Sequence, residues 1–471
     1  MVARRFRTSE LVLAAALAAA TALVAYAAIK KLGSAGLLAP LGLALVVVLL
    51  RRPLVLTCLV VGVAVLAEGP DFGLFTFTAQ LYTHATVMNV MVALVVFSVG
   101  IDMLRHKRRP RVPAPLGVPL ALLALASVAG LVTGHSVGIS VSKELHNENL
   151  LDYMIFLPLA VANLDPTGRE IDLLLKLVFA LAIFKAVVGL ADILSGYAPA
   201  IERSGALTYY EPTANWLMLL ALLGVFGALI GRLRPPLWAL LGSPLILAAL
   251  LLSYRRSFWI AAVLGLLLVL VLALGPVGRR MLIPVALMLI AAVWLIGSVH
   301  VQGSSPLLER ATSLAPSKIT SNVEDRYRLD ERANVLAEIE KHPVTGIGVG
   351  VPWRADARPL PIEHEGGRRY VHFAALWYWL NLGVLGFLAY VSLLLGGALL
   401  AWRVWRRGYE PIVKAFGLAS LCAIAGLVAI ETTASFSGVD TRFTVLFGAQ
   451  LGLLALLSRI AVEQPEFAEE I

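Results

Sequence analysis

Long apolar runs alternate with short polar segments along almost the whole chain. The runs lie near residues 11–29, 33–50, 54–67, 85–104, 114–134, 151–164, 171–191, 213–231, 236–253, 257–275, 281–299, 374–402, 411–430 and 442–458. Most reach the roughly 17 to 25 residues with which a helix crosses a bilayer, whereas those at 54–67 and 151–164 are short enough to be partial or re-entrant. The pattern predicts an all-α polytopic membrane protein with about 12 to 14 transmembrane helices. We interpret the first run as an uncleaved helix rather than a signal peptide.

Small clusters of basic residues fall in loops that alternating spans place on one side of the membrane. They lie at residues 4–7, 51–52, 105–111, 232–234, 279–280 and 403–407. Because short cytoplasmic loops are rich in Lys and Arg, this bias predicts a multi-pass protein of the inner (cytoplasmic) membrane with both termini in the cytoplasm.

The composition supports the membrane assignment, since 59% of the residues are hydrophobic and 15% are charged. The net charge of +9 follows from the loop bias. The basic residues are scattered over short loops rather than gathered in one polar domain, so we expect no nucleic-acid partner. The two cysteines, Cys58 and Cys422, both lie in apolar runs, which argues against a disulfide framework and a zinc site.

The longest polar segments alternate to the opposite side of the membrane. They span residues 68–84, 135–150, 192–212 and 300–371, and the last is charge-balanced and polar enough to fold outside the bilayer. The chain therefore divides into a transmembrane bundle at 1–299, an extracytoplasmic loop at 300–371, and C-terminal transmembrane helices with a cytoplasmic tail at 372–471. The active site of such a protein would face the outside of the membrane.

Within the large loop, residues 324–341 contain no Pro or Gly. Leu329, Ala333, Leu336 and Ile339 recur there at helical spacing, which predicts an amphipathic helix lying along the membrane surface. The alternating glycines that follow, at 346, 348 and 350, lack the spacing of a nucleotide-binding loop and are interpreted as a structural turn, although their amides could also face an anion. The prolines between 352 and 367 predict an irregular cover.

Charged residues at membrane depth are costly, so each is a candidate for function. Arg255 and Arg256 separate two strongly apolar runs on the side that lacks other basic clusters. Guanidinium groups bind phosphate oxygens in a bidentate manner, which suits the diphosphate of a lipid carrier. The alternative is a tight turn anchored by interfacial arginines. Lys185 lies deep in its run and could pair with Asp192 or bind an anionic ligand.

The loop helix and its end offer further candidates. Arg328 and Arg332 share one helical face by their i, i+4 spacing, and the alternative is a solvated face paired with acidic residues such as Asp325 and Glu331. His372 stands where the loop enters the next apolar run. A histidine there could act as a general base or acid on a membrane-borne reactant, or it could be merely amphipathic.

The stretch from Arg328 to Gly386 resembles the core of the O-antigen ligase and O-antigen polymerase superfamily. The matching residues are Arg328, the helix after it, His342-Pro343 with Gly346, Gly348 and Gly350, then His372, Gly383 and Gly386. The resemblance implies a polytopic glycosyltransferase of the GT-C type that acts on glycans carried by undecaprenyl diphosphate. It also implies that the large loop lies outside the cytoplasmic membrane.

The resemblance also implies roles for single residues. His372 matches the essential histidine at the loop end, Arg328 the loop arginine, and Arg255 or Arg256 the arginine of the outer interface. Phe373 and Arg332 depart from the residue types usual at their positions.

The implied reaction is an inverting displacement in which arginines hold the departing diphosphate and His372 accepts a proton from the acceptor hydroxyl. Neither a metal nor a cofactor is expected. The expected partners are the lipid-linked donor, a surface lipid or glycan acceptor, and membrane lipids. A polymerase of the same fold and, from another class, a transporter or flippase are the alternatives.

Overall fold

The computed structural model describes residues 48–66, 80–82, 85–140, 150–195, 212–230, 235–253, 255–273, 323–362 and 367–463. Its α-helices are α3 Pro53–Leu66, α4 Val87–Arg105, α5 Ala114–Ser136, α7 Leu157–Ala162, α8 Gly168–Ser195, α9 Pro212–Ile230, α10 Leu237–Leu252, α11 Arg256–Ala273, α15 Val323–Lys341, α16 Ala374–Arg407, α17 Pro411–Ile430 and α18 Thr441–Glu463. A π-helical segment, η3 Leu150–Phe156, precedes α7, and a short 3₁₀ turn, η4 Gly367–Arg369, precedes α16. Two short antiparallel strands, β1 Gln80–Tyr82 and β2 Ala85–Thr86, lead into α4.

Eight of these helices are long and apolar enough to cross a membrane: α4, α5, α8, α9, α11, α16, α17 and α18. The prediction of an all-α polytopic membrane protein is confirmed. The runs at 54–67 and 151–164 are indeed short, forming the 14-residue α3 and the pair η3–α7. The predicted spans at 11–29 and 281–299, and most of that at 33–50, lie outside the described residues.

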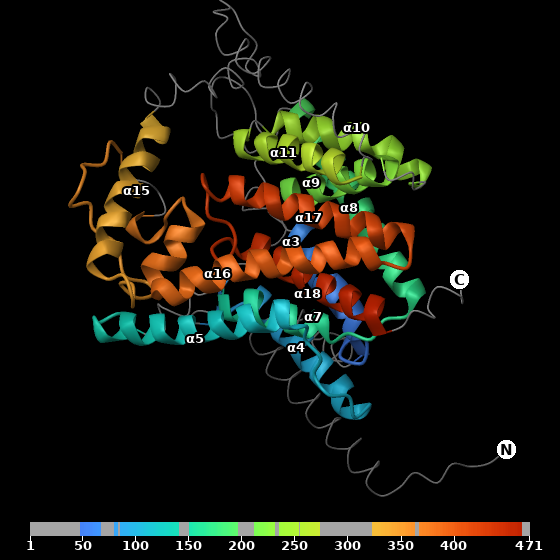
Figure 1. Cartoon of the computed structure of the whole chain (residues 1–471), viewed down its shortest axis with the longest axis horizontal. Coiled ribbons are helices and arrows are strands. Elements are labelled where there is room, and N and C mark those ends of the chain that lie inside the picture. Colours follow the sequence, from blue (N-terminus) through green and yellow to red (C-terminus); the bar gives the residue numbers. More distant parts are fainter. Residues whose placement is uncertain are drawn as a thin grey trace, which may run out of the picture.

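The bundle helices differ in how much of their surface is buried against other helices. Helices α9 and α18 are buried on nearly all sides and pack against α17 and α7, respectively. Helix α11 exposes the apolar side chains of Ile260, Val263 and Leu264. This exposure is compatible with a membrane protein, because an apolar side chain on the outside of a membrane bundle meets lipid rather than water. Helices α5, α11, α16 and α17 run roughly side by side across the view of Figure 1.

Helix α16 links the bundle to the loop domain. It packs against α5 and α17, and it bends at Gly383, where the backbone has φ 70° and ψ −170° inside an otherwise continuous helix. An L side chain rarely adopts this conformation, and a Cβ at Gly383 would lie 2.0 Å from the carbonyl oxygen of Val344. The glycine therefore allows the loop to approach the helix closely.

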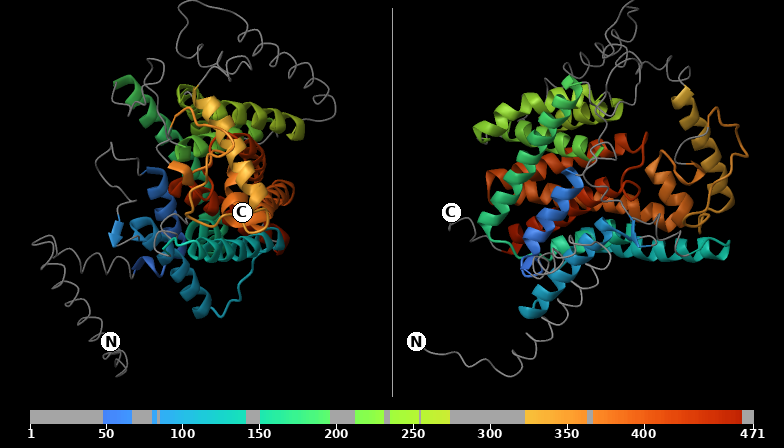
Figure 2. Two further views of the ribbon diagram at one scale, coloured as in Figure 1. Left: turned by 90° about the vertical axis from the view of Figure 1, so that its left-hand side faces the viewer. Right: turned by 180° about the vertical axis from the view of Figure 1, so that it is seen from behind.

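Helix α15 lies across the bundle end at which α16 begins, in both Figure 1 and the rear view of Figure 2. It contacts α16, whereas the bundle helices run away from it toward the other end. The helix expected at 324–341 is confirmed at Val323–Lys341, and its crosswise orientation is that of a helix parallel to a membrane surface.

Candidate functional site

The side of α15 that packs against the protein is largely polar. Glu331 and Asn334 are fully buried there, whereas Leu329, one of the residues that defined the side predicted to face the membrane, is exposed. The burial is possible because these side chains find hydrogen-bond partners. The Asn334 side chain accepts bonds from the backbone N–H groups of Ala357 and Arg358 at 2.8 and 2.9 Å, and its Nδ2 donates to the Arg358 carbonyl at 2.8 Å. It thereby holds the irregular cover against α15.

Glu331 holds His372 by two different bonds. The His372 backbone N–H donates to Glu331 Oε2 at 2.8 Å, and the ring Nδ1 lies 3.0 Å from Oε2 and 3.1 Å from Oε1. Both side chains are shielded from solvent, with exposures of 6% for His372 and 0% for Glu331. Because an ionised carboxylate only accepts hydrogen bonds, Nδ1 carries the proton, and in neutral imidazole the lone pair is then on Nε2.

Two tyrosines fix the plane of the imidazole. The rings of Tyr327 and Tyr370 meet the His372 ring edge to face, with centroids 5.8 and 4.8 Å away. Burial raises the pKa of Tyr327 above its usual range, and the charge of Glu331 and a hydrogen bond to it raise the pKa further. Tyr327 therefore stays protonated and remains a hydrogen-bond donor to Glu331.

Two arginines, one from α15 and one from the start of α11, surround Asp325 on α15. Arg256 Nη2 donates to both carboxylate oxygens of Asp325, at 2.8 and 2.9 Å, and Arg328 Nη1 lies 3.3 Å from Oδ1. All three side chains are mostly buried. The cluster is next to the His372 site along α15, because Arg328 and Glu331 are three residues apart on the helix.

The arrangement distinguishes Arg256 from Arg255, which spacing alone left equivalent. Arg256 begins α11 and contacts Asp325 on α15, 69 residues later in the chain. The backbone N–H of Arg255 donates instead to Ser253 Oγ, at 3.4 Å. The described contacts therefore join Arg256 and Arg328 through one carboxylate.

The other predicted cations lie elsewhere. Lys185 is buried, with 1% exposure, on α8, a helix that packs mainly against α9 and α10. Arg332 is exposed and its guanidinium carbon lies 5.2 Å above the ring of Phe373. Neither belongs to the pair of arginines that shares Asp325.

The contacts of the glycine turn at 346–350 are those of a structural turn, which is the interpretation that the sequence favoured. Gly346, Gly348 and Gly350 all have positive φ. A Cβ at Gly348 would lie 2.3 Å from the backbone nitrogen of Gly134 in α5, so only glycine fits. The amides of Ile347 and Val349 donate to backbone carbonyls in α16 and α5, which secures the turn between the two helices.

The loop between α17 and α18 supports the segment before α16 from the other side. Ser435 Oγ donates to the carbonyl of Val371 at 2.5 Å, and the Ala374 N–H donates to the carbonyl of Glu431 at 3.1 Å. The buried carboxylate of Glu431 accepts bonds from the Tyr390 hydroxyl and from both the N–H and the hydroxyl of Ser437. His372 is thus held between α15 and this loop.

Sequence reasoning missed the functional potential of Asp325 and Glu331. Both were considered only as partners on a solvated helix face, yet both are buried. The available signal was weak: Tyr327, Glu331 and Asn334 recur at intervals of four and three residues. The link to His372, 41 residues later, exists only in the tertiary structure.

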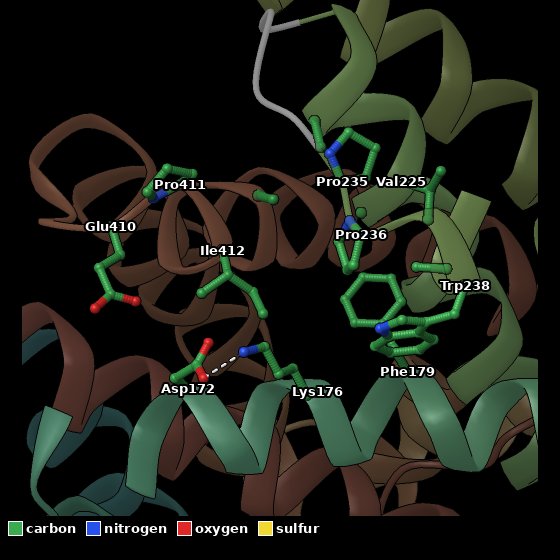
Figure 3. Close-up of a pocket in the computed structure, with 14 residues that line it drawn as sticks. Asp172, Lys176, Phe179, Val225, Pro235, Pro236, Trp238, Glu410, Pro411 and Ile412 are labelled. Carbon is green, nitrogen blue, oxygen red and sulfur yellow. Dashed lines mark hydrogen bonds and ion pairs between the residues drawn. The ribbon is translucent and has the colours of Figure 1, made fainter. Parts of the chain in front are cut away.

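A separate cavity of about 290 Å³ lies toward the opposite ends of the bundle helices, between α8, α9, α10 and the start of α17 (Figure 3). Its polar side chains are Asp172, Lys176 and Glu410, with Asp172 and Lys176 paired at 2.6 Å. Burial, with the charge of Asp172 as a further cause, raises the pKa of Glu410. The cavity contains none of the predicted site residues.

The chain is therefore a polytopic membrane protein with a histidine–carboxylate pair and an arginine cluster at one bundle end. Residues 241–391 match the family model described as O-antigen ligase. This range includes Arg256, Arg328, Glu331 and His372, and the match supports the resemblance to the O-antigen ligase and polymerase superfamily. Proteins of this family are membrane enzymes resembling glycosyltransferases. A comparison with curated proteins found no match.

Proposed function

We propose that this protein transfers a glycan from an undecaprenyl-diphosphate carrier to a surface lipid or another glycan, as an O-antigen ligase does. The observation that carries the proposal is the joining of two sites on α15. A histidine suited to general base catalysis is held by Glu331, and a pair of arginines suited to a diphosphate meets at Asp325, six positions earlier on the same helix. Inverting transfer needs both functions close to one anomeric carbon.

His372 is the proposed catalytic base. With the proton on Nδ1 bound to Glu331, Nε2 accepts the proton of the acceptor hydroxyl as its oxygen attacks the anomeric carbon. The buried carboxylate stabilises the imidazolium that forms, in the manner of the acidic member of a catalytic triad. Glu331 is a positioning residue in this scheme, because it acts through the imidazole.

Arg256 and Arg328 are the proposed donor-binding residues. In the described structure the Asp325 carboxylate lies between the two guanidinium groups, which supports a role for these groups in binding an anionic oxygen pair. A diphosphate leaving group would share these guanidinium groups, and its developing charge would be offset as the glycosidic bond breaks. Lys185 and Arg255 remain predicted donor contacts. We expect transfer to persist in the presence of a chelator, because the guanidinium groups supply the cationic partner.

We also propose that the site faces the outside of the inner membrane, with both termini cytoplasmic and residues 300–371 as the external loop domain. Ala357 is exposed on the cover over α15, so it is a suitable labelling position. An Ala357→Cys variant should react with a membrane-impermeant thiol reagent in cells whose outer barrier has been permeabilised. Labelling that requires disruption of the inner membrane would reverse the proposed orientation.

The decisive experiment is reconstitution of the purified full-length protein with undecaprenyl-diphosphate glycans and extracted acceptor lipids, followed by mass spectrometry. His372→Ala should abolish the product. His106→Ala is the matched control, because His106 is also paired with a carboxylate, that of Asp102, but is exposed just beyond the end of α4. One glycan on a new acceptor supports a ligase, and a ladder of repeats on the carrier indicates a polymerase. Movement of donor across the membrane without a covalent product would refute the enzyme proposal in favour of a transporter.

A further inference from the structure

A second charged cavity lies at the bundle end opposite α15. It has a volume of about 470 Å³ and is bounded by the turn between α4 and α5, the turn between α7 and α8, and the last turns of α18. Among the described residues, five cationic side chains and one carboxylate, that of Asp165, line it. The cations are Lys107, Arg108, Arg109, Arg111 and Arg459. We propose that this cavity binds the phosphate group of an anionic membrane phospholipid.

The cavity wall is held in place by specific bonds. Arg108 pairs with Asp102, its Nη1 lies 3.6 Å from Asp165, and the same nitrogen donates to the carbonyl of Asn163 at 3.4 Å. The Asn163 side chain accepts a bond from the backbone N–H of Arg111 at 2.7 Å, and its Nδ2 donates to the carbonyl of Leu159 at 2.8 Å. The basic turn is thereby attached to the end of α7, so its charges are preorganised around the cavity.

One further observation points to an anionic ligand. Within the part of the chain that the structure describes, the buried Nε of Arg108 has no hydrogen-bond partner, and a phosphate oxygen is an acceptor that would satisfy such a donor.

The apolar part of the cavity favours a lipid over a free ion. Met103, Leu164, Leu456 and Ile460 complete the lining, and Leu104, beside it at the end of α4, is 80% exposed on a helix long enough to span the bilayer. A phospholipid at the membrane interface presents its phosphate to the basic residues while its acyl chains follow such apolar surface. By the positive-inside bias this end is cytoplasmic, where membrane leaflets carry anionic lipids.

The proposal is tested by native mass spectrometry of the full-length protein in neutral detergent, titrated with short-chain phosphatidylglycerol. The test variant is Arg109→Gln/Arg111→Gln, and the control is Arg51→Gln/Arg52→Gln, which removes an exposed basic pair that does not line the cavity. Removing two cations should weaken binding about thirtyfold, equivalent to about 2 kcal/mol. The control should bind as the wild type does.

Zwitterionic phosphatidylcholine and inorganic phosphate serve as the comparison ligands. Equal binding of phosphatidylcholine, or an equal loss in the control variant, would overturn the proposal, because the effect would not come from the cavity or its charge. Binding of inorganic phosphate as tight as that of phosphatidylglycerol would overturn the lipid assignment. Each variant is first compared with wild type by thermal denaturation, and Arg109→Gln alone replaces the double variant if that one unfolds early.

Discussion

The Glu331→Gln substitution tests whether the buried carboxylate orients the His372 ring and stabilises its protonated form. The substitution keeps the size of the side chain and an oxygen that can accept the His372 backbone bond. It removes the negative charge 3.0 Å from Nδ1. At an effective dielectric constant of about 20, Coulomb's law gives about 5 kcal/mol for an imidazolium beside a carboxylate at that distance. If the dipole of the glutamine amide supplies about half of this stabilisation, about 2 to 3 kcal/mol is lost in the transition state, and kcat should fall by roughly 30- to 150-fold.

The assay is the reconstituted transfer reaction with separate measurement of kcat and of KM for the donor. We expect kcat to fall with little change in KM, because Glu331 acts on the proton-accepting group and not on the diphosphate. Glu338→Gln is the matched control: Glu338 is also a buried carboxylate of α15, but it pairs with Lys341 at 2.9 Å. A Glu331→Gln enzyme with wild-type kcat and unchanged thermal stability would refute the positioning role.

Three further predictions concern other parts of the site. Arg256→Lys keeps the charge but would lose the proposed two-pronged contact with a diphosphate, so the donor KM should rise about tenfold. Arg326→Lys, on the exposed side of α15, should have no effect, and equal KM values would exclude Arg256 from donor binding. Gly348→Ala should destabilise the protein by at least about 2 kcal/mol in thermal or denaturant unfolding, whereas Gly367→Ala, with positive φ but open space around it, should cost about 1 kcal/mol. Burial raises the pKa of Glu431 above its usual 4.5, so the stability contributed by its protonated form is fully present below 4.5 and is lost as the pH rises through the raised pKa. Thermal scans should therefore show a steeper fall with pH in wild type than in Glu431→Gln, and parallel curves would contradict the shift.

Much of the helical architecture could be predicted from the sequence. The apolar runs that became α5, α9 and α17 were located to within about two residues, because a helix in a bilayer must satisfy its own backbone hydrogen bonds over a fixed length. The helix at 323–341 was recognised by the absence of Pro and Gly. The polar character of its buried side was not predicted, because the periodicity of apolar residues indicates only the side expected to meet the membrane.

The candidate site was predicted only in part. His372, Arg328 and the arginine pair at 255–256 were identified one by one from position and resemblance. Their partners were not, because Asp325 and Glu331 are ordinary acidic residues on a polar helix when read in sequence.

The sequence by itself determined that this chain spans a membrane many times, that one polar loop contains a helix, and that cations stand where that loop meets the bilayer. Those properties depend on local composition and on the thickness of a bilayer. The tertiary structure alone decided that Arg256 rather than Arg255 meets Asp325, and that Glu331 contacts His372. These pairings join residues 69 and 41 positions apart, and they arise from the packing of α15 across the bundle end. No local pattern could specify them.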